Sequence, residues 1–104
     1  MEVYSISEIA NRISPVMVKY EIPKAYIFGS YARGEATENS DVDILIAGKE
    51  IHGFCRFSNL LQDITEAVGK DVDLLQEYTL DAYDDAEAKE LKHSILQDRR
   101  QIYG

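Results

Sequence analysis

The sequence contains few cysteines and no long apolar run. Its one cysteine, Cys55, excludes an intrachain disulfide, and because no histidine stands in a recognisable catalytic arrangement with it, we expect a packed thiol. No apolar segment approaches the length of a membrane-spanning helix, and the first ten residues lack the basic start and apolar run of a secretory signal. We therefore expect a cytoplasmic protein that does not insert into membranes.

Basic residues are also scarce. The chain has 11 Lys and Arg against 19 Asp and Glu, which gives a formal net charge of -8. Phosphate groups of DNA and RNA repel such a chain unless cations or a local basic patch intervene, so we expect no direct binding to nucleic acid. If the substrate carries phosphates, a metal ion becomes the expected mediator.

Proline and glycine are rare as well, with 2 Pro and 6 Gly in 104 residues, and 45% of the residues are apolar. This composition is typical of a globular protein and excludes a low-complexity or disordered chain. At this length we expect a single domain over residues 1–104, with a real but modest hydrophobic core. Apolar helix faces on so small a domain favour contact with a partner chain or a homo-oligomer.

Hydrophobic periodicity predicts the element order helix, strand, strand, helix, strand, helix. Ser5 and Glu8 have capping-box spacing, so the first helix begins near residue 7, and Pro15 either kinks it or starts a second turn. Ser30 is expected to cap a short helical turn, and residues 80–85 to form a loop or a helix start. The other predictions are strands at residues 25–28, 42–47 and 72–76 and helices at 57–68 and 87–102. This order favours an α+β fold, a small mixed β-sheet flanked by helices.

Two acidic strands repeat nearly the same letters, DVDIL at residues 41–45 and DVDLL at residues 71–75. Side chains alternate between the faces of a strand, so Asp41 and Asp43 share one face and the apolar residues between them face the core. The Asp face is then exposed or lines a cleft. Asp71 and Asp73 share a face in the same way.

Carboxylates crowded on one sheet face repel each other, and a divalent cation removes that conflict. Hard oxygen ligands suit Mg²⁺, and the Gly29–Ser30 turn just before the acids offers backbone N–H groups to a phosphate. A lone Asp-x-Asp is more often a solvated face, and a lone Gly-Ser is usually only a turn. The combination of strand, Gly-Ser, Arg, polar loop and paired acids is what favours a site.

The stretch GSYARGEATENSDVD resembles the signature G-S-x-A-R-G-x(5)-S-D-x-D of the DNA polymerase β-like nucleotidyltransferase superfamily, and is closest to its minimal nucleotidyltransferases. The third acid of the family lies on a later strand, where VDLL places Asp73. The closing HSILQDRRQIYG is similar to the last helix of the family. The positions that fit the signature are Gly29, Ser30, Ala32, Arg33, Gly34, Ser40, Asp41 and Asp43.

The resemblance implies a catalytic site with two Mg²⁺ ions and ATP as substrate. Asp41 and Asp43 would bind the ions, and Asp73 would complete the second ion's site and help to deprotonate the acceptor. Gly29 and Ser30 would hold the β- and γ-phosphates. Arg33 and Ser40 are also assigned to the nucleotide site, and each has a structural role as an alternative. Arg33 contacts phosphate or braces the loop against an acid such as Glu35 or Glu38, and Ser40 caps the turn that enters the strand.

The same resemblance implies the reaction and the partner. A nucleoside monophosphate, AMP from ATP, would pass to an acceptor hydroxyl and release pyrophosphate. Because the chain ends at Gly104 after the expected last helix, we expect another chain to supply acceptor recognition. In this family that partner is a HEPN-type toxin, and the nucleotidyltransferase is the antitoxin that modifies a toxin Tyr. Two alternatives stay open: a non-catalytic antitoxin that acts by binding, and a nucleotidyltransferase for a small-molecule or nucleic-acid hydroxyl.

Overall fold

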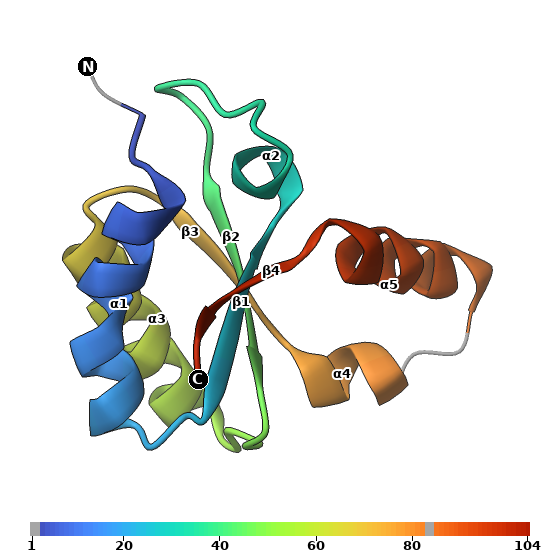
Figure 1. Cartoon of the computed structure of the whole chain (residues 1–104). Coiled ribbons are helices and arrows are strands. Elements are labelled where there is room, and N and C mark those ends of the chain that lie inside the picture. The colour runs from blue at the N-terminus through green and yellow to red at the C-terminus, as the bar shows by residue number, and fades with distance from the viewer. Residues whose placement is uncertain (1–2, 83–84) are drawn as a thin grey trace.

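A computed structural model describes residues 3–82 and 85–104 as a four-stranded mixed sheet with helices on both faces (Figure 1). The strand order is β3-β2-β1-β4, with β2 and β3 parallel and the other two pairs antiparallel. The predicted α+β class is therefore confirmed. The elements are α1 (Ile6–Lys19), β1 (Lys24–Phe28), α2 (Gly29–Ala32), β2 (Val42–Ala47), α3 (Phe54–Val68), β3 (Val72–Gln76), α4 (Glu77–Ala82), α5 (Ala86–Asp98) and β4 (Arg100–Tyr103).

The first helix begins as its sequence predicts. The Ser5 hydroxyl accepts a hydrogen bond from the Glu8 amide, and the Glu8 carboxylate accepts one from the Ser5 amide, which completes the capping box. The helix continues through Pro15 to Lys19. Its buried side lies beside α3, and together the two helices cover one face of the sheet (Figure 1).

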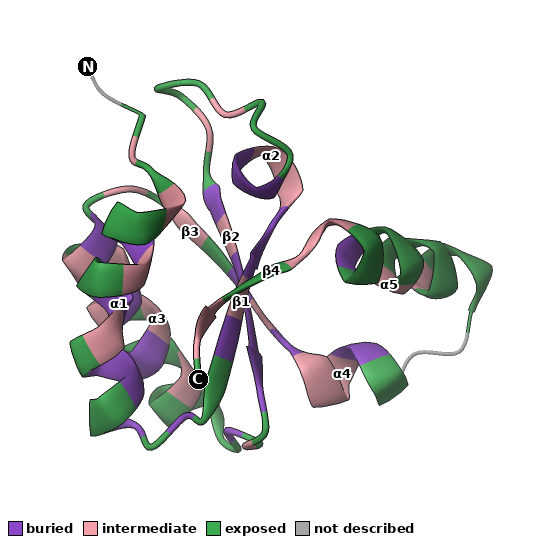
Figure 2. Ribbon diagram, viewed as in Figure 1, coloured by how far each residue is buried: buried purple, intermediate pink, exposed green. Residues whose placement is uncertain are grey.

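The two faces of the sheet bury different residues (Figure 2). Val42, Ile44 and Ile46 of β2 enter the main core under α1 and α3, as their alternation predicts. On the opposite face, Leu45 packs with a smaller cluster that includes Leu80 of α4 and Ile95 of α5. The face that carries the aspartates is therefore open only in part, because α4 and α5 cover the rest of it.

The C-terminal segment corrects one prediction. The last helix ends at Asp98, and residues 100–103 form β4, which pairs antiparallel with β1 at the edge of the sheet. The helix-forming composition of the segment misled the prediction, because pairing with the distant β1 and half-burial of Ile102 and Tyr103 against the main core outweigh local propensity.

Two local predictions also change. The short α2 begins at Gly29 after Phe28, and no side chain caps it, so Ser30 is not its cap. The expected loop or helix start at residues 80–85 is in part the helix α4, while residues 83 and 84 lie outside the described part of the chain. Within the described residues, no helix has the length and apolar character required to cross a membrane.

Candidate active site

The Gly29 backbone lies directly against a carboxylate of the neighbouring strand. Gly29 follows β1 with a φ of 71°, in the left-handed region that favours glycine. A Cβ at this position would stand 2.0 Å from Oδ2 of Asp43. Only a residue without a side chain therefore allows the Gly-Ser turn to approach the acidic strand this closely.

The predicted acids lie at the same end of two adjacent parallel strands. Asp43 of β2 is paired in register with Asp73 of β3, so their side chains leave the same face of the sheet. Asp41 comes one residue before β2. Asp41 and Asp73 are exposed, whereas Asp43 is half-buried beside Gly29. Asp71 is exposed too.

Burial, followed by the negative charges of Asp73 and Asp41, raises the pKa of Asp43 above its ordinary value of 3.8, and the cation of Arg33 acts in the opposite direction. The three carboxylates therefore lie close enough to affect each other. Within residues 3–82 and 85–104, no three acidic, histidine or cysteine side chains lie close enough together to hold a metal ion. A metal site here would therefore require the carboxylates to move together, and their oxygen chemistry fits Mg²⁺.

A cleft of about 330 Å³ opens beside Asp43, whereas Asp41 and Asp73 are not among the residues that line it. One wall consists of Gly29, Ser30, Arg33 and Asp43, and the opposite wall is α5. Sequence reasoning did not assign α5 to the site. No spacing or motif marks its contribution, because α5 reaches the cleft only through the tertiary arrangement. The residues of α5 that line the cleft are Leu91, Ser94, Ile95 and Asp98.

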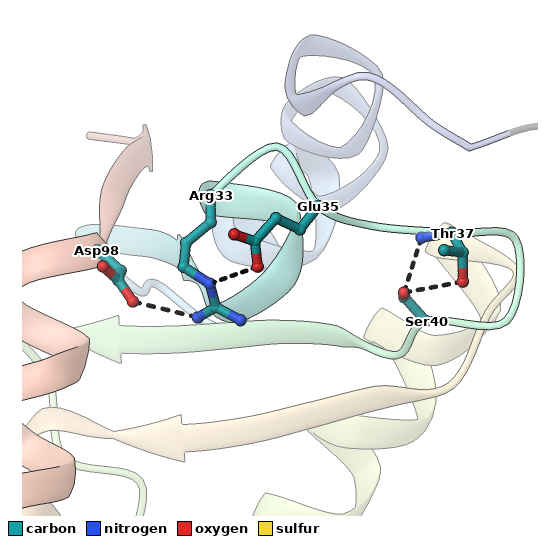
Figure 3. Close-up of polar contacts among 5 residues, drawn as sticks. All are labelled: Arg33, Glu35, Thr37, Ser40 and Asp98. Atoms are coloured by element: carbon teal, nitrogen blue, oxygen red, sulfur yellow. Dashed lines mark hydrogen bonds and ion pairs between the residues drawn. The ribbon is translucent and has the colours of Figure 1, made fainter.

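Arg33 connects the two walls of the cleft (Figure 3). Its guanidinium donates to Glu35 at 3.1 Å and to Asp98 of α5 at 3.2 Å. These two hydrogen bonds raise the pKa of Arg33, which stays a cation. The contact with Glu35 is the brace expected from the sequence, and the contact with Asp98 was not foreseen. The structure thus favours the bracing role.

Ser40 lies at the end of the polar loop, where its hydroxyl accepts a hydrogen bond from the Thr37 amide at 2.8 Å (Figure 3). The Ser40 amide donates in return to the Thr37 carbonyl at 3.0 Å. This pair closes the turn just before Asp41, as the sequence predicts. Cys55, by contrast, is exposed rather than packed, because it lies on the solvent side of the first turn of α3.

Known proteins resemble this chain in sequence and in structure. Residues 11–104 match the model of a family described as polymerase beta, nucleotidyltransferase. A Methanocaldococcus jannaschii protein, named as a candidate protein adenylyltransferase, is 41% identical over 71 residues, or 68% of this chain and 76% of that protein. Protein adenylyltransferase MntA of Thermococcus cleftensis is 39% identical over 62 residues, or 60% of this chain and 63% of that protein.

A solved structure shares the fold. The crystal structure of a toxin-antitoxin with AMP-PNP superposes with a TM-score of 0.71 at 25% sequence identity. The superposition covers 91% of this chain and 73% of that chain.

Proposed function

This chain belongs to the polymerase β nucleotidyltransferase family, and we propose that it is a protein adenylyltransferase that transfers AMP from ATP to a Tyr hydroxyl of a HEPN-type toxin, as an antitoxin. The observation that carries the proposal is the contact of Gly29 with Asp43 beside Asp73. At this contact, a backbone turn suited to binding phosphate and two acids suited to binding a cation lie together at one end of the sheet.

Three aspartates have the chemistry of the metal site. Asp41 and Asp43 would hold Mg²⁺, and Asp73, opposite Asp43 in register, would complete the site of a second ion. When bound, the ions would neutralise phosphate charge and favour displacement at phosphorus. The missing Cβ at Gly29 leaves the space beside Asp43 that such a site requires.

The remaining residues orient the nucleotide. Gly29 and Ser30 line the cleft next to Asp43, where their backbone approaches the β- and γ-phosphates of ATP. Arg33 holds this turn against α5, and Ser40 closes the loop that leads to Asp41. Such binding would orient the α-phosphorus for attack by the acceptor oxygen.

The reaction is a displacement at the α-phosphorus. The Tyr oxygen of the acceptor forms a bond to this phosphorus, the bond from the phosphorus to the oxygen that bridges to the β-phosphate breaks, and pyrophosphate leaves. The exposed Asp73 carboxylate accepts the Tyr proton. The product is a toxin Tyr that carries AMP.

The relatives support the class of acceptor. Two of them are named as protein adenylyltransferases, one as a candidate, and the solved toxin-antitoxin holds an ATP analogue. A protein acceptor also agrees with the charge of -8, which disfavours a polynucleotide acceptor.

The test combines the purified protein, ATP labelled with ³²P at the α-phosphate, and Mg²⁺ with a HEPN protein as the acceptor. We expect label on the HEPN protein, loss of labelling with Asp43→Asn, and loss of labelling when a chelator removes Mg²⁺. Labelling that is absent, or that is unchanged in Asp43→Asn, contradicts the proposal. If a variant with both Asp41→Ala and Asp43→Ala still protects cells from the toxin, the chain acts by binding alone.

A further inference from the structure

Lys70 lies outside the motif that identifies the family, in the turn between α3 and β3. The helix ends at Gly69, whose φ of 79° turns the chain toward β3, and Lys70 is the next residue. Its side chain is half-buried and points back toward the loop before β2.

The ammonium group of Lys70 donates two hydrogen bonds to segments distant in sequence. One reaches the Tyr31 hydroxyl at 3.0 Å and the other reaches the Glu38 carbonyl at 3.0 Å. The same nitrogen lies 5.6 Å from the centre of the Tyr31 ring and 5.9 Å from that of Tyr4. Charge-assisted hydrogen bonds and cation–π contacts together hold the ammonium in one place.

Each contacted segment carries part of the candidate site. Tyr31 follows Ser30 in α2, Glu38 lies in the loop that leads to Asp41, and Lys70 itself precedes the strand that carries Asp73. The backbone strengthens the same junction, because the Asp71 carbonyl accepts a hydrogen bond from the Val42 amide at 3.0 Å.

We propose that Lys70 is a positioning residue for the metal and nucleotide site. Its ammonium holds α2, the loop before Asp41 and the start of β3 in one relative position. The phosphate-binding turn and the carboxylates of two strands thereby keep the spacing that Mg²⁺ and ATP require. This inference rests on the proposed nucleotide chemistry but adds a residue to it.

The effect of Lys70 is expected to be geometric. Arg33 is the cation that acts on Asp43, and Lys70 is not among the charges that shift the pKa of that carboxyl. Loss of Lys70 should therefore loosen the loop and weaken binding of the Mg²⁺–nucleotide complex, while the pH dependence of binding stays unchanged.

The test measures calorimetric binding of AMP-PNP with Mg²⁺ to the full chain, which needs no toxin. We expect Lys70→Met to weaken binding about 10- to 100-fold, the usual effect of losing a group that orients metal ligands. Lys70→Arg should recover part of the loss. The matched control is Lys19→Met, which loses the 2.9 Å ion pair with Asp63 between α1 and α3 but touches no site segment.

A milder variant keeps the test decisive if Lys70→Met does not fold. Tyr31→Phe removes the hydroxyl that accepts from Lys70 and keeps the buried ring. We expect it to weaken binding too, with an effect that does not add to that of Lys70→Met.

The outcomes separate this inference from the proposed function. If the wild type binds the Mg²⁺–nucleotide complex and folded Lys70→Met and Tyr31→Phe bind it equally well, Lys70 has no positioning role. Equal weakening by Lys19→Met overturns the inference as well, since the effect would then be one of general stability. If the wild type binds no nucleotide, the proposed function itself is wrong.

Discussion

At the scale of single residues, Gly29 and Asp43 determine each other's environment. The left-handed turn at Gly29 brings its backbone against the Asp43 carboxylate, with no room for a methyl group. Burial of Asp43 beside this backbone turn is the largest cause of its raised pKa. The site thus combines a steric constraint with an electrostatic cost, which is common where function and stability compete.

A pair of glycine substitutions separates the steric constraint from backbone strain. Gly29 and Gly34 have φ values of 71° and 74°, but only at Gly29 would a Cβ collide with Asp43. Gly34→Ala should cost about 1–2 kcal/mol, the cost of the left-handed conformation. Gly29→Ala should cost more and reduce AMP transfer at least about 100-fold, because the carboxylate must move.

Urea unfolding and the labelling assay check these values, and Gly34→Ala is the control for strain. Equal stability and equal activity in the two alanine variants would show that the contact between Gly29 and Asp43 is not important.

Stability should depend on pH through Asp43. Because its folded pKa lies above 3.8, the stability gained from the bound proton is full below that pH and disappears as pH rises through the folded pKa. Without Mg²⁺, Asp43→Asn should therefore melt a few degrees higher than the wild type at pH 7, and the gap should close below pH 3.8.

Thermal unfolding followed by circular dichroism measures this gap. Adding Mg²⁺ at pH 7 should raise the Tm of the wild type but not that of Asp43→Asn. A lower Tm for Asp43→Asn at pH 7 in the absence of metal would contradict the raised pKa.

At the scale of elements, α5 is the part of the site that few packing contacts attach to the rest of the protein. Ile95 is its one side chain described as buried, and Leu91 and Leu96 are half exposed. The ion pair between Arg33 and Asp98 ties the helix to the turn after α2. Behind it, Arg99 contacts Glu77 at 3.2 Å and stacks over the Tyr26 ring, which links the end of α5 to α4 and β1.

The two roles considered for Arg33 predict different outcomes. If Arg33 braces α5, Arg33→Gln and Asp98→Asn should each lower Tm by a few degrees at most and weaken AMP-PNP binding to a similar extent. The double variant should then resemble Arg33→Gln alone, because Asp98→Asn removes a contact that Arg33→Gln already removes. If only Arg33→Gln weakens binding, the guanidinium contacts phosphate directly.

At the scale of the whole molecule, the negative net charge limits the partners that the chain can bind. A net charge of -8 opposes polyanions, and the acidic site requires a cation before it accepts a triphosphate. The same charge favours a partner with a basic surface.

We accordingly expect no binding to single-stranded RNA at about 0.1 M salt, where phosphate attraction requires clustered Lys and Arg. Fluorescence anisotropy with a labelled oligonucleotide, with and without Mg²⁺, measures this. Saturable binding that weakens as salt increases would show a basic patch that the overall charge conceals.

The sequence by itself determined the strands β1, β2 and β3, the apolar face of β2 and the family motif. These depend on local rules: alternation along residues 42–47, the helical stripe that ends at Gly69, and the capping box at Ser5. The candidate acids followed from the same alternation and from the motif, and the structure brings Asp43 and Asp73 into register.

Only the tertiary structure decided what depends on distant contacts. Residues 100–103 became a strand because β1 offered a free edge, whereas their local composition favoured a helix. Likewise, α5 became a wall of the cleft, and Lys70 reached Tyr31 across 39 positions of sequence. No periodicity encodes such contacts, since they arise only when the sheet brings separate segments together.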